Sequence, residues 1–265
     1  MTFPQLKNKR MKWGMENVYK IEALLCYMKI LIGCPTYERY EYCIDQWVKA
    51  ARQIIKSTKE HQTDYLLVDN SKTDDFYLRS KSKGINIEKI PYSENVKQRL
   101  VDSRNLLREK ALKGGYDYFF SLEQDVIPCK DVLKQLIKDD KDIISAYYSK
   151  PIGATVQEKE TGKISEVVLE IPLIYLQTDG GVRRACPPEI VNKGIIPVGA
   201  FGVGCVLIKR EVLEKIKFRF EEGKPAFDDF LFCHDAKRAG YALFLDLDIR
   251  AEHLHVPWTD VERKS

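Results

Sequence analysis

The chain has 265 residues, of which 44% are hydrophobic and 31% are charged. Such a chain can bury a sizeable core, which excludes disordered and fibrous proteins and allows one large α/β domain or two small ones. Its 43 Lys and Arg against 39 Asp and Glu leave a formal net charge of only +4. A dedicated nucleic-acid-binding protein needs a marked basic excess, so nucleic acid is disfavoured as a partner.

The cysteines and the hydrophobic runs indicate the compartment. Seven cysteines are scattered along the chain with no CxxC pair, which is typical of reduced thiols in a cytosolic protein. No window reaches the roughly 18 to 20 uninterrupted apolar residues of a membrane span, and the N-terminus lacks the apolar region of a signal peptide. We therefore expect a cytoplasmic protein that contacts a membrane at most peripherally.

The first 27 residues differ from the rest of the chain. They are polar, are interrupted by Gly14, and carry five basic and two acidic side chains, which is most of the net positive charge. Met28 then opens the run MKILIGCPTYE, a natural start for a domain whose first strand is central. We expect residues 1–27 to be a dispensable extension or a mis-chosen start, and residues 259–265 to be a tail, around one domain spanning 28–258.

Strands and helices alternate between residues 28 and 150. Short apolar runs predict the strands, and apolar side chains recurring every three to four residues predict an amphipathic helix. The expected strands cover 29–34, 64–71, 85–90, 116–125 and 141–149, and the expected helices cover 44–55, 93–115 and 131–140. Such alternation predicts an α/β fold with a mostly parallel central sheet flanked by helices.

The second half of the chain, residues 151–258, has a more mixed pattern. Alternating polarity predicts antiparallel strands or a ribbon, and paired glycines and prolines predict a loop. The expected elements are a ribbon in 162–177, a loop in 180–194, a strand followed by a helix in 200–216, a helix in 227–241 and a last strand in 241–255.

Polar side chains come directly after the apolar runs of three predicted strands. In an open α/β sheet, ligands bind beyond the carboxyl ends of the strands, so these positions form one candidate site. They are Pro35, Thr36, Tyr37 and Glu38 after the first strand, Asp69, Asn70 and Ser71 after the second, and Glu123, Gln124 and Asp125 after the fourth.

Glu123 and Asp125 are the sharpest of these signals. In an extended chain residues i and i+2 point to the same side, so both carboxylates can face one spot while Gln124 faces away. Two such acids repel unless a cation lies between them, and hard oxygen ligands suit Mg²⁺ or Mn²⁺ bridging a diphosphate. The alternative is a solvated acidic turn that leads into Pro128.

Two further pairs carry candidate chemistry. Asp228 and Asp229 begin the helix in 227–241, where they can serve as ordinary helix-start charges or supply a general base. His253 and His255 end the last strand, where they can ligate a metal or form a plain surface pair.

Arg104 lies within the helix predicted in 93–115. Its guanidinium can clamp a diphosphate with two parallel hydrogen bonds, or it can be an ordinary solvated helix charge.

Together these segments resemble the GT-A (Rossmann-like) glycosyltransferase fold, and within it the inverting glycosyltransferase family 2. The similarity runs in order from about Met28 to His255. Its most specific stretch is DDFLFCHDAKRAGY, which resembles EDxDFCxRAxxAGY. The other matching segments are PTYER, VDNSKTDD for VDDGSTD, SRN for ARN, EQD in place of DxD, VGAFGVGCVLIKREVLEKI for the acceptor-side glycine segment, and DLDIRAEHL for the closing strand.

The resemblance implies a role for each candidate residue. It makes 28–150 the nucleotide-sugar-binding half and 151–258 the mixed acceptor and catalytic half. It implies that Asp229, beside Asp228, is the general base and that Asp125 with His253, or His255, binds Mn²⁺ or Mg²⁺. The residues implied to contact the nucleotide sugar are Pro35, Thr36, Tyr37, Glu38, Asp69 (base or ribose), Asn70, Arg104, Glu123 and Gln124.

The chain departs from the family pattern at several positions. Glu123 stands where the family has Asp, and Asp228 stands where it has Glu. Leu231 and Asp235 replace a usual Asp and Arg, and these two changes affect acceptor contacts more than the catalytic step.

The implied activity is metal-dependent, inverting transfer of a sugar from a nucleotide-diphosphate sugar to a hydroxyl of a glycan, lipid-linked or small-molecule acceptor. Two alternatives stay open. One is a sugar-1-phosphate nucleotidyltransferase, which would have a glycine-rich basic loop where this chain has GCPTYER. The other is a non-catalytic nucleotide-sugar-binding module, which would have no need to keep the EQD, DD and HLH segments intact.

Overall fold

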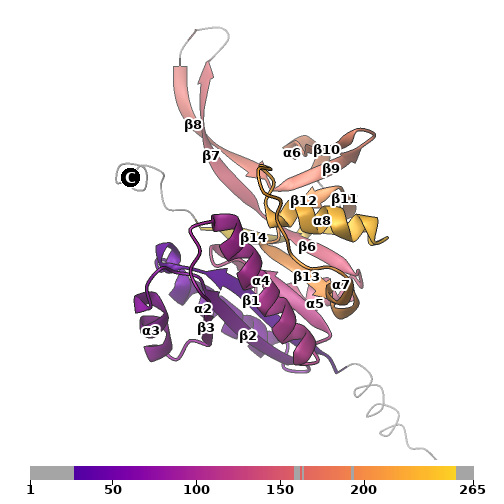
Figure 1. The fold of residues 1–265 in the computed structure, drawn as a ribbon. Helices are drawn as coiled ribbons and strands as arrows, with labels where there is room; N and C mark the ends of the chain where they lie inside the picture. The colour runs from indigo at the N-terminus through magenta and orange to yellow at the C-terminus, as the bar shows by residue number, and fades with distance from the viewer. Residues whose placement is uncertain (1–26, 158–161, 163, 192–193, 255–265) are drawn as a thin grey trace, which may run out of the picture.

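The central feature of the structure, a computed structural model that describes residues 27–157, 162, 164–191 and 194–254, is a nine-stranded sheet. Its order is β11-β14-β6-β13-β4-β1-β2-β3, with β5 paired to β14 (Figure 1). Strands β1 to β4, β6 and β14 run in one direction, whereas β13, β11 and β5 run against their neighbours, so the predicted mostly parallel sheet is confirmed. The strands are β1 (Lys29–Thr36), β2 (Gln62–Asp69), β3 (Ile87–Lys89), β4 (Tyr118–Leu122), β5 (Val126–Pro128), β6 (Ile143–Tyr147), β11 (Ile195–Val198), β13 (Cys205–Lys209) and β14 (Leu243–His253).

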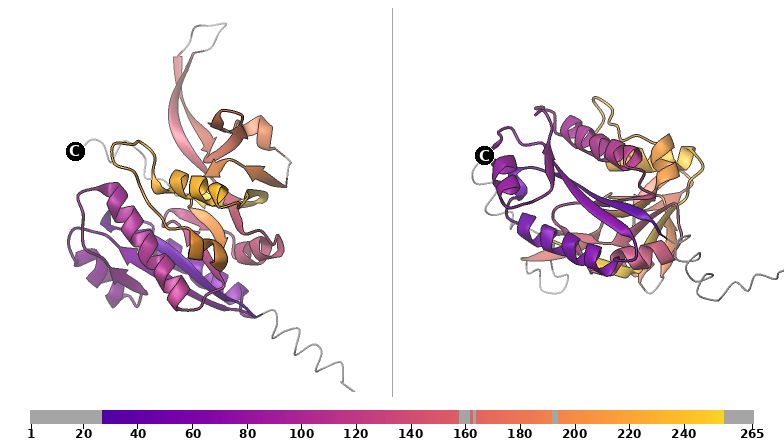
Figure 2. Two further views of the ribbon diagram at one scale, coloured as in Figure 1. Left: turned by 45° about the vertical axis from the view of Figure 1, so that its right-hand side comes forward. Right: turned by 90° about the horizontal axis from the view of Figure 1, so that it is seen from below.

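Helices cover both faces of this sheet, as the view from below in Figure 2 shows. Among the described residues no helix is long and apolar enough to cross a membrane. The helices are η1 (Glu38–Tyr40, a 3-10 turn), α2 (Ile44–Ser57), α3 (Asp75–Ser82), α4 (Val96–Lys113), α5 (Val132–Lys138), α6 (Pro187–Ile190), α7 (Arg210–Lys215) and α8 (Asp228–Arg238).

Alternation along β1 explains the two hydrophobic cores. Because successive side chains of a strand point to opposite faces, Leu31 packs in one core with Leu107 of α4. Ile30 and Ile32 pack in the other core with Trp47 of α2. The apolar stripe predicted for the first helix is therefore buried against the sheet.

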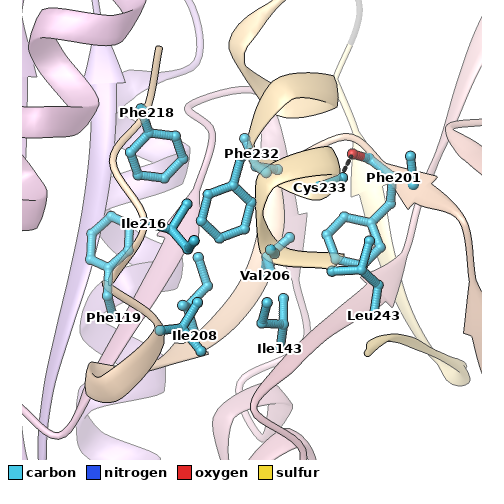
Figure 3. Close-up of a cluster of buried hydrophobic side chains, with 14 of the residues drawn as sticks. Phe119, Ile143, Phe201, Val206, Ile208, Ile216, Phe218, Phe232, Cys233 and Leu243 are labelled. Atoms are coloured by element: carbon cyan, nitrogen blue, oxygen red, sulfur yellow. Dashed lines mark hydrogen bonds between the residues drawn. The ribbon is translucent and has the colours of Figure 1, made fainter. Parts of the chain in front are cut away.

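Helix α8 is held in place by its own buried side chains, as Figure 3 shows. The ring of Phe232 stacks on Phe218 with centroids 4.9 Å apart. The thiol of Cys233 donates to the carbonyl oxygen of Phe201 at 3.6 Å. These contacts anchor the second turn of the helix, directly after the first turn that carries Asp228 and Asp229.

The second half adds a ribbon and a small sheet. Strand β8 (Ile164–Pro172) lies in the stretch 162–177 where a ribbon is predicted, but its partner is β7 (Ser149–Gln157), which lies outside that stretch. The two strands form an antiparallel ribbon that projects from the body in Figure 1. The small sheet has the order β10-β9-β12 and contains β9 (Ile174–Thr178), β10 (Gly181–Arg184) and β12 (Ala200–Phe201).

The predicted loop in 180–194 is wrong in part, because this segment holds both β10 and α6. Residues 179–180 form the turn between β9 and β10, and Gly181, at φ 141°, begins β10 opposite Thr178. Pro187 and a capping box between Cys186 and Glu189 then start the short helix.

Gly33 in β1 provides a test of the core. A Cβ at this position would overlap the ring of Phe119 and come within 3.2 Å of Leu107 Cδ1. Gly33→Ala should lower the free energy of unfolding by about 1 to 3 kcal/mol through overpacking. Urea unfolding measures this, with Gly153→Ala as the control, since a Cβ there meets nothing within 4 Å. Equal stability of the two variants would contradict the prediction.

Candidate functional site

The carboxyl ends of β1 and β2 are joined by hydrogen bonds. Asn70 N donates to the carbonyl of Thr36 at 2.9 Å, and Glu38 N donates to Ser71 Oγ at 2.8 Å. Pro35 and Thr36 are buried, and Thr36 Oγ1 has no hydrogen-bond partner within the described part of the chain. This edge of the sheet therefore has a fixed backbone.

The next residues open toward the surface. Tyr37 is half-buried, and its ring packs edge to face on Tyr40 with centroids 5.1 Å apart. Glu38 is exposed. Tyr37 and Glu38 are thus the first residues after β1 with side-chain surface for a ligand.

Asp69 is fully buried, and its carboxylate already has partners on both oxygens. Oδ1 accepts from Ser71 N at 2.9 Å and from Ser71 Oγ, and Oδ2 accepts from Lys89 Nζ at 3.1 Å. Asn70 is also buried and donates to Ser103 Oγ of α4 at 3.1 Å. Asp69 therefore shapes this loop, and its direct contact with a base or ribose stays a prediction.

Arg104 lies at the centre of a buried ionic group. Its Nη1 donates to Asp228 Oδ2 at 2.5 Å and its Nη2 to Glu123 Oε1 at 2.5 Å. The side chain is only 3% exposed, so the solvated helix charge considered above is excluded. Burial alone would lower the pKa of Arg104, but Asp228 and Glu123 outweigh it and raise that pKa. The guanidinium joins the end of β4 to the start of α8.

Glu123, Gln124 and Asp125 lie in a turn, so the expected extended geometry is wrong. Val126 N donates to the carbonyl of Glu123 at 3.0 Å and closes the turn. The two carboxylates consequently take different partners: Glu123 binds Arg104, whereas Asp125 faces His253. Gln124 is buried, and its Oε1 has no hydrogen-bond partner among the described residues.

Glu123 also borders a residue that the sequence reading missed, Tyr148. The Tyr148 hydroxyl accepts from Gly204 N at 2.9 Å. A Cβ on Gly204 would lie 2.7 Å from that hydroxyl and 2.9 Å from Glu123 Oε2, so only glycine fits between them. Burial raises the pKa of Glu123 to about 7; Arg104 opposes this rise and Asp125 adds to it. Tyr148 directly follows β6, so examining the residue after that strand, as for three other strands, would have identified it.

Asp125 and His253 lie within hydrogen-bond distance of each other. Asp125 Oδ2 lies 3.2 Å from His253 Nε2, and His253 Nδ1 lies 3.0 Å from the carbonyl of Ser149. Burial lowers the pKa of His253, but the hydrogen bond that its Nε2–H donates to the Asp125 carboxylate outweighs burial, so the pKa is raised.

The donor set of this pair fits Mn²⁺ or Mg²⁺. If the imidazole is neutral and its proton lies on Nδ1, where the Ser149 carbonyl accepts it, the Nε2 lone pair would face the Asp125 side and be open to a cation in place of the proton. Across the described ranges no group of three or more His, Cys, Asp or Glu gathers, so Asp125 and His253 are the two residues that would hold the ion. His255 lies outside the described residues.

Asp228 and Asp229 are adjacent but differ in environment. Asp228 is buried against Arg104. Asp229 is only half-buried, and its Oδ1 accepts from Phe230 N at 2.7 Å. Burial raises the pKa of Asp229; Arg104 opposes this shift, and the Asp228 carboxylate adds to it. A carboxylate with a raised pKa and an open side suits proton transfer, so Asp229 is the better base candidate.

Removing the charge of Arg104 should destabilise the protein strongly. Arg104→Met leaves Asp228 buried without its partner, and the free energy of unfolding should fall by about 3 to 5 kcal/mol. Urea unfolding measures this, with Arg99→Met on the same helix as the control, because Arg99 is only half-buried. The double variant with Asp228→Asn should recover part of the loss, and a single variant as stable as the control would contradict the prediction.

No protein-family model and no curated protein matches this sequence. Solved structures match at low identity. S. aureus TarS 1-349 is 17% identical with TM-score 0.52, over 84% of this chain and 59% of that one. The TarS 1-349 complex with UDP-GlcNAc is 15% identical with TM-score 0.50, over 88% of this chain and 61% of that one. GalNAc-T7 with UDP, GalNAc and Mn²⁺ is 12% identical with TM-score 0.51, over 87% of this chain and 44% of that one.

The chain thus spans between about two fifths and three fifths of the length of these structures. Identities this low carry the fold alone. The strand order, the helices on both faces and these matches together show that the chain has the GT-A glycosyltransferase fold.

Proposed function

We propose that this chain is a metal-dependent glycosyltransferase that moves a sugar from a nucleotide-diphosphate sugar to an acceptor hydroxyl with inversion. The observation that carries the proposal is the 3.2 Å approach of Asp125 Oδ2 and His253 Nε2 at the end of β14. This pair lies beside the ionic group formed by Glu123, Arg104 and Asp228. Asp229 directly follows Asp228 in the first turn of α8. Two side chains that can bind one divalent cation, next to a half-buried carboxylate that can act as a base, supply the groups that metal-dependent transfer uses.

In the proposed reaction Asp229 removes the proton from the acceptor hydroxyl. The acceptor oxygen forms a bond to the anomeric carbon while the bond from that carbon to the diphosphate oxygen breaks. A divalent cation bound by Asp125 and His253 would supply charge neutralisation for the diphosphate leaving group. Arg104 keeps Asp228 and Glu123 in place, so the first turn of α8 holds its position. One base opposite the leaving group gives inversion.

The structural neighbours suggest which donors to test first. TarS has been crystallised with UDP-GlcNAc and with UDP, and GalNAc-T7 with UDP, GalNAc and Mn²⁺. We therefore infer a uridine-diphosphate hexose or N-acetylhexosamine as donor, and Mn²⁺ or Mg²⁺ as cofactor. Six cysteines of the described residues are free thiols, which supports a reducing, cytoplasmic compartment.

Isothermal titration with UDP, GDP, CDP and their sugars, with and without Mn²⁺, tests the proposal, followed by a donor-hydrolysis assay. We expect one nucleotide to bind more tightly with Mn²⁺ and its sugar to be hydrolysed slowly. Binding without any hydrolysis or transfer would favour a non-catalytic module, and absence of nucleotide binding would overturn the proposal.

The raised pKa of Asp229 predicts the pH dependence of the reaction. A base works only when deprotonated, and burial raises the pKa of this carboxyl above its ordinary value. As the pH falls, kcat should therefore decline through a midpoint higher than that of an ordinary Asp. A profile of kcat against pH with saturating donor and metal measures this. A rate that stays flat down to the ordinary Asp range would remove Asp229 from the base role.

A further inference from the structure

A hollow of about 540 Å³, lined in part by Phe227, has no role in the mechanism above. It lies between the first turn of α4 and the segment 220–227, which leads into α8. Its volume is in the range of about 300 to 1,000 Å³ that small-ligand sites occupy.

Contacts between Lys97 and the 220–227 segment tie the two walls of this hollow together. Lys97 Nζ donates to the carbonyl oxygen of Lys224, and it lies 5.1 Å from the ring centroid of Phe227. The Phe227 side chain is 43% exposed, unlike the buried Phe218 and Phe232 nearby. An aromatic ring is thus held in position with much of its surface open.

The charges around the hollow cancel. Two lysines, Lys97 and Lys224, and two glutamates, Glu221 and Glu222, line it. Glu221 also accepts from Arg219 Nη1 at 2.7 Å. A phosphate or another anion would meet the glutamates, whereas sugar hydroxyls can accept from lysines and donate to carboxylates. The apolar C–H face of a sugar ring packs well on an exposed aromatic ring.

The position of the hollow relative to the base suits an acceptor. Phe227 is two residues from Asp229, so their Cα atoms lie no more than about 7 Å apart. Lys97 and Arg104 are seven residues apart on one helix, about 10 Å along its axis. The hollow therefore begins about one sugar ring away from the group that would receive the proton.

We propose that this hollow binds a neutral sugar residue of the acceptor, stacked on Phe227, next to the hydroxyl that attacks. Its identity as an acceptor site depends on the proposed function, but sugar binding itself does not.

Saturation-transfer NMR with methyl β-D-glucopyranoside, methyl β-D-galactopyranoside and methyl N-acetyl-β-D-glucosaminide tests this on the full chain, with and without UDP and Mn²⁺. At least one probe should bind, with saturation strongest at ring C–H protons. Phe227→Ala should weaken that binding about tenfold or more, and Phe227→Tyr should retain it. The control is Leu78→Ala, because Leu78 on α3 is 58% exposed and belongs to neither site.

The outcomes separate the two proposals. If none of the three sugars binds the wild type, or if Phe227→Ala binds like the control, the sugar site is overturned, whatever nucleotide binding shows. Sugar binding that depends on Phe227, in a chain that binds no nucleotide diphosphate, would leave the site standing and overturn the proposed function. Urea unfolding of Phe227→Ala confirms that any loss of binding comes from a folded protein.

Discussion

Asp229→Asn should reduce kcat by about 10²- to 10⁴-fold, because the amide cannot take the proton of the acceptor hydroxyl. The change is nearly isosteric, and Phe230 N can still donate to the remaining carbonyl oxygen of the side chain, as it does to Asp229 Oδ1 at 2.7 Å. Donor binding should therefore stay close to that of the wild type. Sugar transfer measured with saturating donor and metal, together with titration of the nucleotide, checks both parts.

Asp179→Asn is the matched control for this experiment, because Asp179 is exposed between β9 and β10. Asp228→Asn gives a second comparison. It removes a partner of Arg104, so it should lower stability more than Asp229→Asn does. Near-wild-type transfer by Asp229→Asn would show that another group is the base.

Asp125→Asn and His253→Gln should each weaken Mn²⁺ binding by at least about 10- to 100-fold, and activity should fall with it. Each variant removes one of the two protein ligands inferred from the 3.2 Å contact between Asp125 Oδ2 and His253 Nε2. Isothermal titration of Mn²⁺ into the nucleotide-bound protein measures the affinity. Adding EDTA to the wild type should abolish transfer, and adding Mn²⁺ should restore it.

Glu252→Gln is the control for these two variants. Glu252 precedes His253 on β14, but its side chain is exposed, so its loss should leave Mn²⁺ affinity unchanged. If Asp125→Asn binds Mn²⁺ as the control does, this pair is not the metal site. A loss in His253→Gln alone would leave the histidine as a ligand and remove Asp125 from the set.

Local sequence patterns were enough to predict most of the elements. The stripe that includes Trp47 and Ile54 predicts helix α2, and apolar runs ending in polar residues predict β1, β2 and β4. These patterns work because side-chain periodicity depends on neighbours a few residues away. The paired glycines and prolines in 180–194 were insufficient to predict β10 and α6. Strand β10 forms because it pairs with β9, and α6 depends on its capping box, so both need contacts that composition does not specify.

The sequence by itself determined the order of strands and helices and the polar residues that end the strands. Only the tertiary structure decided which of those residues meet. Arg104 pairs with Asp228, 124 positions away, and Asp125 pairs with His253, 128 positions away. Tyr148 reaches the Glu123 region because β13 lies between β4 and β6. Such contacts follow from strand order and helix placement across the whole chain, and no local periodicity records them.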